Sequence, residues 1–147
     1  MSRLLLRRLL SGVCSAALAI VGAAVQAHEY YAEGFLLVHP WANPTEPGAT
    51  EVPVYFDIDD IVREDRLVSA SAHWAGSAEL RPGDDRATPA LAALSFGPGV
   101  AVEFGPGNPH LLLSGVKLPL QWGRSYSLTM VFEKAGPIVV MVSVGAH

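Results

Sequence analysis

The segment FGPGNPHLLLSGVKLPLQWG, residues 104–123, carries the strongest structural signals in this chain. Glycine and proline form one corner at 105–109 and another at 115–123, and between them His110 leads a short apolar run. Such corners around an apolar run are typical of a turn that leads into a buried strand. We therefore expect a strand from His110 to Ser114, with the imidazole at its start. A side chain placed there can bind a ligand or hydrogen-bond a loop carbonyl.

The rest of the chain after residue 27 is also predicted to consist of short strands. Alternating apolar and polar residues between turn signals favour strands at 35–41, 52–58, 66–72, 91–96, 100–104, 125–133 and 138–144. Residues 28–34 are predicted to form a polar arm, and residues 134–137 a hairpin turn. Because no segment has a convincing helical period, we expect a single all-β domain, an antiparallel sandwich or barrel.

The first 27 residues have the organisation of a signal peptide. Arg3, Arg7 and Arg8 precede an apolar run over 9–21, and Val25-Gln-Ala27 forms a small-x-small cleavage site. We expect cleavage after Ala27, which leaves a domain of residues 28–147. The apolar run is shorter than the roughly 20 residues of a membrane span, and no later segment is long and uncharged enough. The sequence thus predicts secretion without stable insertion in a membrane, with a twin-arginine route as the alternative.

Cys14 is the single cysteine of the chain and lies inside the apolar run of the leader. Val13 precedes it, where a lipoprotein signal has a small residue, so we expect Cys14 to leave with the leader. The secreted protein would then contain no cysteine. Disulfides, thiolate metal sites and cysteine nucleophiles are excluded on this reading.

Charge and motif content restrict the function further. The formal net charge is -4, and every acidic residue lies after residue 27, so the secreted domain is more acidic than the whole chain. An acidic domain is a poor partner for nucleic acid or anionic lipid, but it is compatible with metal cations or a basic protein. The chain has no G-x-S-x-G elbow, H-E-x-x-H pair or phosphate-binding loop, and we predict that it is not an enzyme.

The segment 104–123 resembles the corresponding part of the periplasmic copper chaperone family PCu(A)C, whose members carry a G-G-Y-H-L-M-L-M-G-L-K-x-P-L-like sequence there. The resemblance continues at His39-Pro-Trp-Ala42, Asp65–Ser71, Ala78-Glu-Leu80 and Leu128–Glu133. It spans nearly the whole chain after the leader. It implies a cupredoxin-like Greek-key fold, a periplasmic location and a role in copper handling.

The resemblance also implies where copper ligands should lie. The family holds Cu(I) with two histidines and two methionines, because thioether sulfur and imidazole suit a soft monovalent ion. Here Arg81 stands at the first histidine, and the H-x-M pair reads His110-Leu-Leu112. No methionine occurs between Met1 and Met130. Arginine and leucine offer no lone pair, so one of the four family ligands remains, His110.

His28 is a second candidate ligand, on chemical grounds. Cleavage after Ala27 would give it a free α-amine, which together with ring Nδ1 forms a chelate for Cu(II). A further imidazole from His110 would make a nitrogen-rich site that favours Cu(II) over other divalent ions. The competing interpretations are a first residue without a function at His28, and a histidine that hydrogen-bonds a loop carbonyl at His110.

The remaining histidines and methionines are predicted to be structural. His39 is expected to be a packed or edge residue, and His147 a terminal one. His73 follows a strand and could approach the metal face, although packing is the simpler role. Met130 and Met141 lie on the last two strands, where core packing is the default.

Two functions follow from these observations. The first is a periplasmic copper-binding or copper chaperone-like protein with an altered site at His110, with or without His28, and with another copper chaperone or an oxidase assembly factor as partner. The second is a metal-free protein-binding module, because three of four ligands are missing. In either case Arg81 beside the pocket would repel Cu(I).

Overall fold

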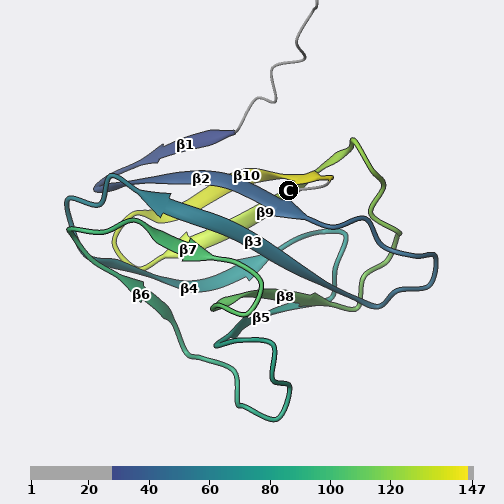
Figure 1. Cartoon of the computed structure of the whole chain (residues 1–147). Coiled ribbons are helices and arrows are strands. Elements are labelled where there is room, and N and C mark those ends of the chain that lie inside the picture. Colours follow the sequence, from purple (N-terminus) through teal and green to yellow (C-terminus); the bar gives the residue numbers. More distant parts are fainter. Residues whose placement is uncertain (1–27, 146–147) are drawn as a thin grey trace, which may run out of the picture.

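The computed structural model of the protein describes residues 28–145, which form ten β-strands and no helix (Figure 1). The predicted signal peptide with Cys14, and the terminal His147, lie outside the described residues. No helix that could cross a membrane occurs in the described part. The strands are β1 Glu29–Ala32, β2 Phe35–Ala42, β3 Glu51–Asp59, β4 Asp65–Ser71, β5 Ser77–Arg81, β6 Leu94–Phe96, β7 Val102–Phe104, β8 His110–Ser114, β9 Ser125–Phe132 and β10 Gly136–Val144.

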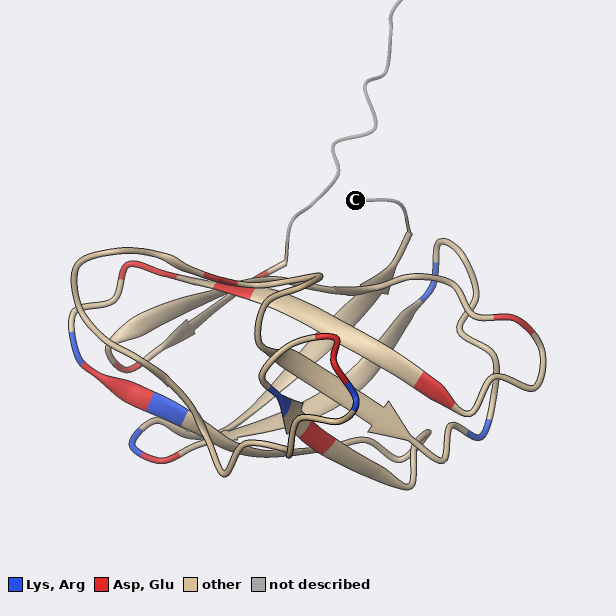
Figure 2. Ribbon diagram, turned by 60° about the horizontal axis from the view of Figure 1, so that its bottom comes forward, with Lys and Arg blue, Asp and Glu red and all other residues tan. Residues whose placement is uncertain are grey.

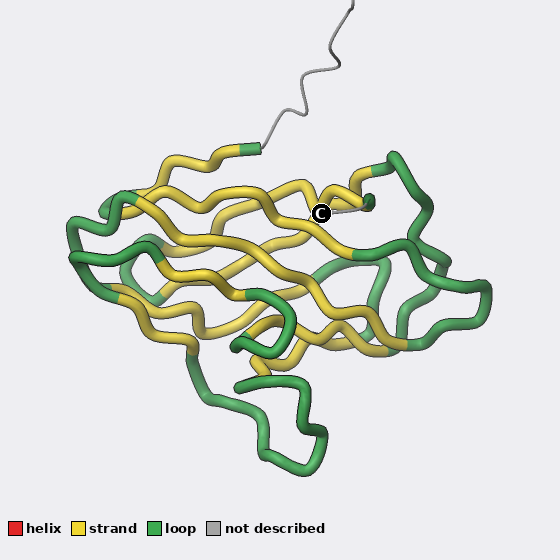
Figure 3. Tube along the Cα trace, in the orientation of Figure 1, coloured by secondary structure: helices red, strands yellow, loops and turns green. Residues whose placement is uncertain are grey.

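The strands join in the order β5-β8-β3-β2-β10-β9-β4-β6, with β1 added to β2 and β7 added to β3. Neighbours are antiparallel except β2 and β10, which are parallel where Trp41 lies beside Ser143. The sheet curls into a nearly closed barrel, and the loops collect around its ends (Figure 3). The predicted all-β sandwich or barrel is therefore confirmed.

The sequence predicted most strands closely but missed two of them, β1 and β5. β8 has the predicted bounds, whereas the polar arm contains the edge strand β1, which pairs with β2 over Glu29–Ala32. Tyr30 explains the difference, because its Oη accepts a hydrogen bond of 2.6 Å from the backbone N–H of Met141 in β10. Of the predicted strand 91–96, only β6 forms, and residues 77–81 form β5 instead.

Alternate residues of the strands fill the barrel with apolar side chains. The rings of Phe35, Phe96 and Phe132 cluster, with centroids of Phe35 at 4.9 and 4.8 Å from the other two. Trp74 is fully buried, and its indole N–H donates to the carbonyl of Ser127 at 2.7 Å. Each such large side chain contributes about 1.5–3 kcal/mol to folding by its burial.

The hairpin between β9 and β10 is held by a buried carboxylate. Asp65 accepts hydrogen bonds from three backbone N–H groups, those of Arg66 (2.8 Å), Lys134 (2.9 Å) and Ala135 (2.9 Å). Burial alone would raise the pKa of Asp65, but these donors outweigh it and the pKa lies below its ordinary value. The turn ends at Gly136 with φ of 77°, a left-handed conformation that suits glycine. The predicted hairpin is confirmed.

Candidate functional site

His110 begins β8 directly after the corner that the sequence predicted. The backbone N–H of Asn108 donates to the carbonyl of Gly105 at 2.9 Å, and Gly107 adopts the positive φ of 77° that the turn requires. His110 is 4% exposed, and its Nδ1 lies 2.8 Å from the carbonyl oxygen of Asn108.

This hydrogen bond fixes which ring nitrogen of the imidazole donates to the loop. A carbonyl oxygen only accepts, so Nδ1 must carry the proton, and Nε2 of the neutral ring keeps a free lone pair. Metal-binding histidines commonly donate their second ring N–H to a backbone carbonyl in the same way. In a neutral ring with this tautomer, Nε2 is the nitrogen with a lone pair for a ligand.

The residues at the family's ligand positions come together around His110. Arg81 lies directly opposite it in the β5–β8 register, and directly opposite residues share one face of a sheet. Leu112 is two residues further along β8 and lies on the same face. The Tyr55 ring packs edge-on against the imidazole, with centroids 5.4 Å apart. These four residues line a hollow of about 290 Å³, together with Pro53, Gly83, Asp84 and Arg86.

Arg81 holds the adjoining loop, residues 82–90. Its guanidinium Nη2 donates to the carbonyl oxygens of Thr88 (2.6 Å) and Asp85 (3.0 Å), and Nη1 lies 3.5 Å from a carboxylate oxygen of Glu79. Arg81 is 6% exposed, so these carbonyl groups replace most of the water around a buried cation. Nothing in the sequence marked these bonds, because backbone carbonyls are the same at every position.

The hollow offers few groups that could coordinate a metal. Within residues 28–145, no three His, Cys, Asp or Glu side chains lie close enough together to hold an ion. His110 and Asp84 are the lining residues with a suitable lone pair. Burial raises the pKa of Tyr55, with a smaller contribution from the charge of Asp84, so the phenol stays neutral at pH 7 and is a poor ligand.

The structure does not bring His28 to His110. His28 precedes β1, its carbonyl accepts the N–H of His39 at 2.9 Å, and its Nδ1 lies 3.4 Å from Ser143 Oγ. β2 and β3 lie between β1 and β8, so the two histidines are about three strand spacings, or ~14 Å, apart. His73 also lies elsewhere, with Nδ1 at 3.5 Å from Ser127 Oγ.

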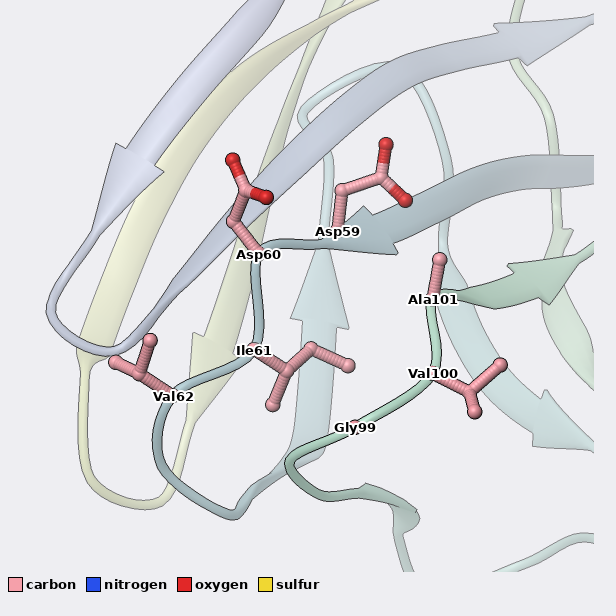
Figure 4. A pocket seen from close by; sticks show the side chains of 7 residues that line it. All are labelled: Asp59, Asp60, Ile61, Val62, Gly99, Val100 and Ala101. Atoms are coloured by element: carbon pink, nitrogen blue, oxygen red, sulfur yellow. The ribbon is translucent and has the colours of Figure 1, made fainter.

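A larger hollow of about 700 Å³ lies between residues 59–62 and 99–101 (Figure 4). Its only charged lining groups are the carboxylates of Asp59 and Asp60, and apolar side chains such as Val62 and Val100 surround them. No nitrogen or sulfur donor side chain lines it. The view in Figure 2 shows lysine and arginine as separate spots, several of them next to acidic residues.

Comparison with known proteins places this fold among solved domains. The model of the LpqE-like lipoprotein family matches residues 36–144. The apo PCuAC domain from PmoF1 superposes with a TM-score of 0.73 at 27% identity, over 82% of this chain and all of that domain. The copper-bound PCuAC domain from PmoF2 gives 0.71 at 26% identity, over 82% and 99%.

A more distant structure shares the fold alone. The solution structure of CuI-DR1885 from Deinococcus radiodurans has a TM-score of 0.62 at 18% identity, over 84% of this chain and 83% of that one. No curated protein matches the sequence. The predicted cupredoxin-like fold is confirmed by these superpositions. Because the family model covers most of its length, the chain belongs to the LpqE-like family and folds as a domain of the PCuAC copper-chaperone type.

Proposed function

We propose that this protein handles copper outside the cytoplasm through a site reduced to His110. The observation that carries the proposal is the 2.8 Å contact between His110 Nδ1 and the carbonyl oxygen of Asn108, in a residue that lines the hollow. The similarity to a copper-bound PCuAC domain supports copper as the metal.

A single imidazole cannot complete a copper coordination shell. Leu112 contributes no donor atom, and the guanidinium of Arg81 has no lone pair. The positive charge of Arg81 is partly offset by the loop carbonyls and by Glu79, so it weakens copper binding without abolishing it. The other donors would come from a partner, such as another copper chaperone or an oxidase assembly factor. Such a shared site suits transient transfer better than storage.

The predicted leader and the family both support a location outside the cytoplasm. The residues before His28 are organised for export, and the matching family is one of lipoproteins. Cleavage after Ala27 would release a periplasmic protein that begins at His28, whereas lipid attachment would retain Cys14. Intact-mass measurement of the exported protein distinguishes a chain that begins at His28 from one that begins at a lipidated Cys14.

Copper titration tests the role of His110. The protein beginning at His28 is titrated with Cu(I) against a competing chelator. The His110→Ala and His110→Gln variants are expected to bind Cu(I) more weakly than the wild type, because the donor that anchors the shared site is lost. His39→Asn is the matched control, because asparagine tolerates the positive φ of 51° at that position. Equal stoichiometry and affinity in the wild type and both His110 variants would contradict the proposal.

A metal-free protein-binding module is the second candidate, and Arg81 favours it. Its guanidinium occupies the position of the first family ligand and anchors the loop without any metal. If the folded wild type takes up no copper and copper leaves its unfolding temperature unchanged, this candidate replaces the first.

A further inference from the structure

A second group of soft donor atoms lies around Met141, on the outer face of β9 and β10. Val140 and Val142 point into the core and are fully buried, so Met141 between them points outward and is partly exposed. This placement differs from the core role predicted for Met141. Met130 on β9 is fully buried and has that core role. An outward methionine on a strand is free to present its thioether sulfur to a ligand.

His28 flanks Met141 from one side. Its Nδ1 lies 3.4 Å from Ser143 Oγ, and Ser143 is two residues beyond Met141 on the same face of β10. The edge strand β1 is held in this place by Tyr30, whose Oη accepts the N–H of Met141 itself at 2.6 Å. His28 and Tyr30 are alternate residues, so both side chains leave the same side of the chain and reach β10.

His73 flanks Met141 from the other side. Ser127 lies directly opposite Met141 in the β9–β10 register, so their side chains share the outer face about 5 Å apart. His73 Nδ1 is 3.5 Å from Ser127 Oγ. The backbone of His73 is held by Lys117, whose Nζ donates to its carbonyl at 3.2 Å, and by the buried Trp74 that follows.

We propose that Met141, His28 and His73 form a second metal site, selective for a soft monovalent cation such as Cu(I) or Ag(I). One thioether and two imidazoles are the donors that such ions prefer. Both imidazoles are exposed, and their serine contacts of 3.4 and 3.5 Å are long, so they can turn toward Met141 at little cost. Cleavage after Ala27 would add the α-amine of His28 to the same site.

This site is independent of the copper site proposed at His110. It lies on β10 and its neighbours, whereas His110 lies on β8 beyond β2 and β3. Loss of one site would leave the donors of the other untouched. The two proposals can therefore fail separately.

Silver titration with methionine labelling tests the second site. After the leader is removed the chain contains two methionines, Met130 and Met141, and the protein beginning at His28 can be labelled with ¹³C in their ε-methyl groups. Stoichiometric Ag(I) is expected to shift the Met141 resonance and to leave that of the buried Met130 in place. A Met141 resonance that does not move, or equal shifts of both, would overturn the proposal.

Variants identify the other ligands. Met141→Leu and His73→Ala are expected to weaken this Ag(I) site at least about tenfold, since even residues behind metal ligands matter by 10–100-fold. His110→Ala should leave the Met141 shift unchanged, and His110→Ala should weaken Cu(I) binding by the same factor with or without Met141→Leu. Thermal unfolding verifies that each variant folds. If Met141→Leu and His73→Ala bind Ag(I) as the wild type does, the assignment is wrong.

Discussion

Replacement of Arg81 by leucine tests how the site is held together without metal. Leucine keeps an apolar side chain in the buried position but removes the donors to Asp85 and Thr88. Each hydrogen bond from a charged donor makes a net contribution of about 1.5–3 kcal/mol to the stability of the fold. The two bonds of 2.6 and 3.0 Å therefore set an upper limit of ~6 kcal/mol for the loss.

The expected loss of stability is smaller than this limit, because burial of the Arg81 guanidinium has a desolvation cost in the wild type. Nε of Arg81 is buried without a partner, and its ion pair with Glu79 is long at 3.5 Å. Leucine relieves this desolvation cost, so we expect a destabilisation of about 2–4 kcal/mol. In a domain of this size each kcal/mol lowers the unfolding temperature by ~4 °C, which predicts a decrease of about 8–16 °C.

Urea and thermal unfolding measure the loss, and hydrogen exchange locates it. The amide of Leu91 donates to the carbonyl of Leu80 at 2.7 Å across the base of the loop, and its protection should fall in Arg81→Leu. The matched control is Arg86→Leu, since Arg86 belongs to the same loop but makes an exposed ion pair with Glu51. This control should unfold close to the wild type. Equal stability of the wild type and Arg81→Leu would refute the reasoning.

Three further predictions follow from individual contacts. Asp65→Asn should destabilise the fold by about 2–3 kcal/mol, because three backbone donors lose their carboxylate. Since the pKa of Asp65 is lowered in the folded state, the stabilisation by the carboxylate is fully present above the ordinary pKa of about 3.9 and is lost as the pH falls through the lower folded pKa. Acid unfolding curves of the wild type and the variant should therefore converge at low pH. Arg81→His combined with Leu112→Met places three donors on one face of β5 and β8, and should raise Cu(I) affinity at least ~100-fold in chelator competition if each added donor contributes about tenfold. Tyr30→Phe removes the acceptor for Met141 N–H, and should speed amide exchange in β1 with little change in global unfolding.

Strand register brings the residues of the candidate site together. Arg81, His110 and Leu112 occupy one face of β5 and β8 because strand register fixes their neighbours, whatever the side chains are. The charge of Arg81 has partners beside His110, since the loop carbonyl oxygens of Asp85 and Thr88 accept hydrogen bonds from its guanidinium. The loop after β5 is therefore held by internal hydrogen bonds.

The sequence by itself determined the class of fold and the limits of the chemistry. Alternation along strands such as β3 and β9 predicts buried and exposed faces without tertiary information, because side chains in a strand alternate by geometry. The corner before His110 predicts its place at the start of β8. The lack of methionine between Met1 and Met130 leaves no thioether sulfur in the segments where the resemblance implies the family's methionine ligands.

Only the tertiary structure decided which donors meet. His28 lies beside Ser143, 115 residues later, and Arg81 bonds to backbone carbonyls that carry no signature in the sequence. The polar arm became β1 because Tyr30 reaches Met141 across 111 residues. Contacts of this kind depend on cross-strand register and side-chain reach between distant segments, and a one-dimensional pattern does not encode either.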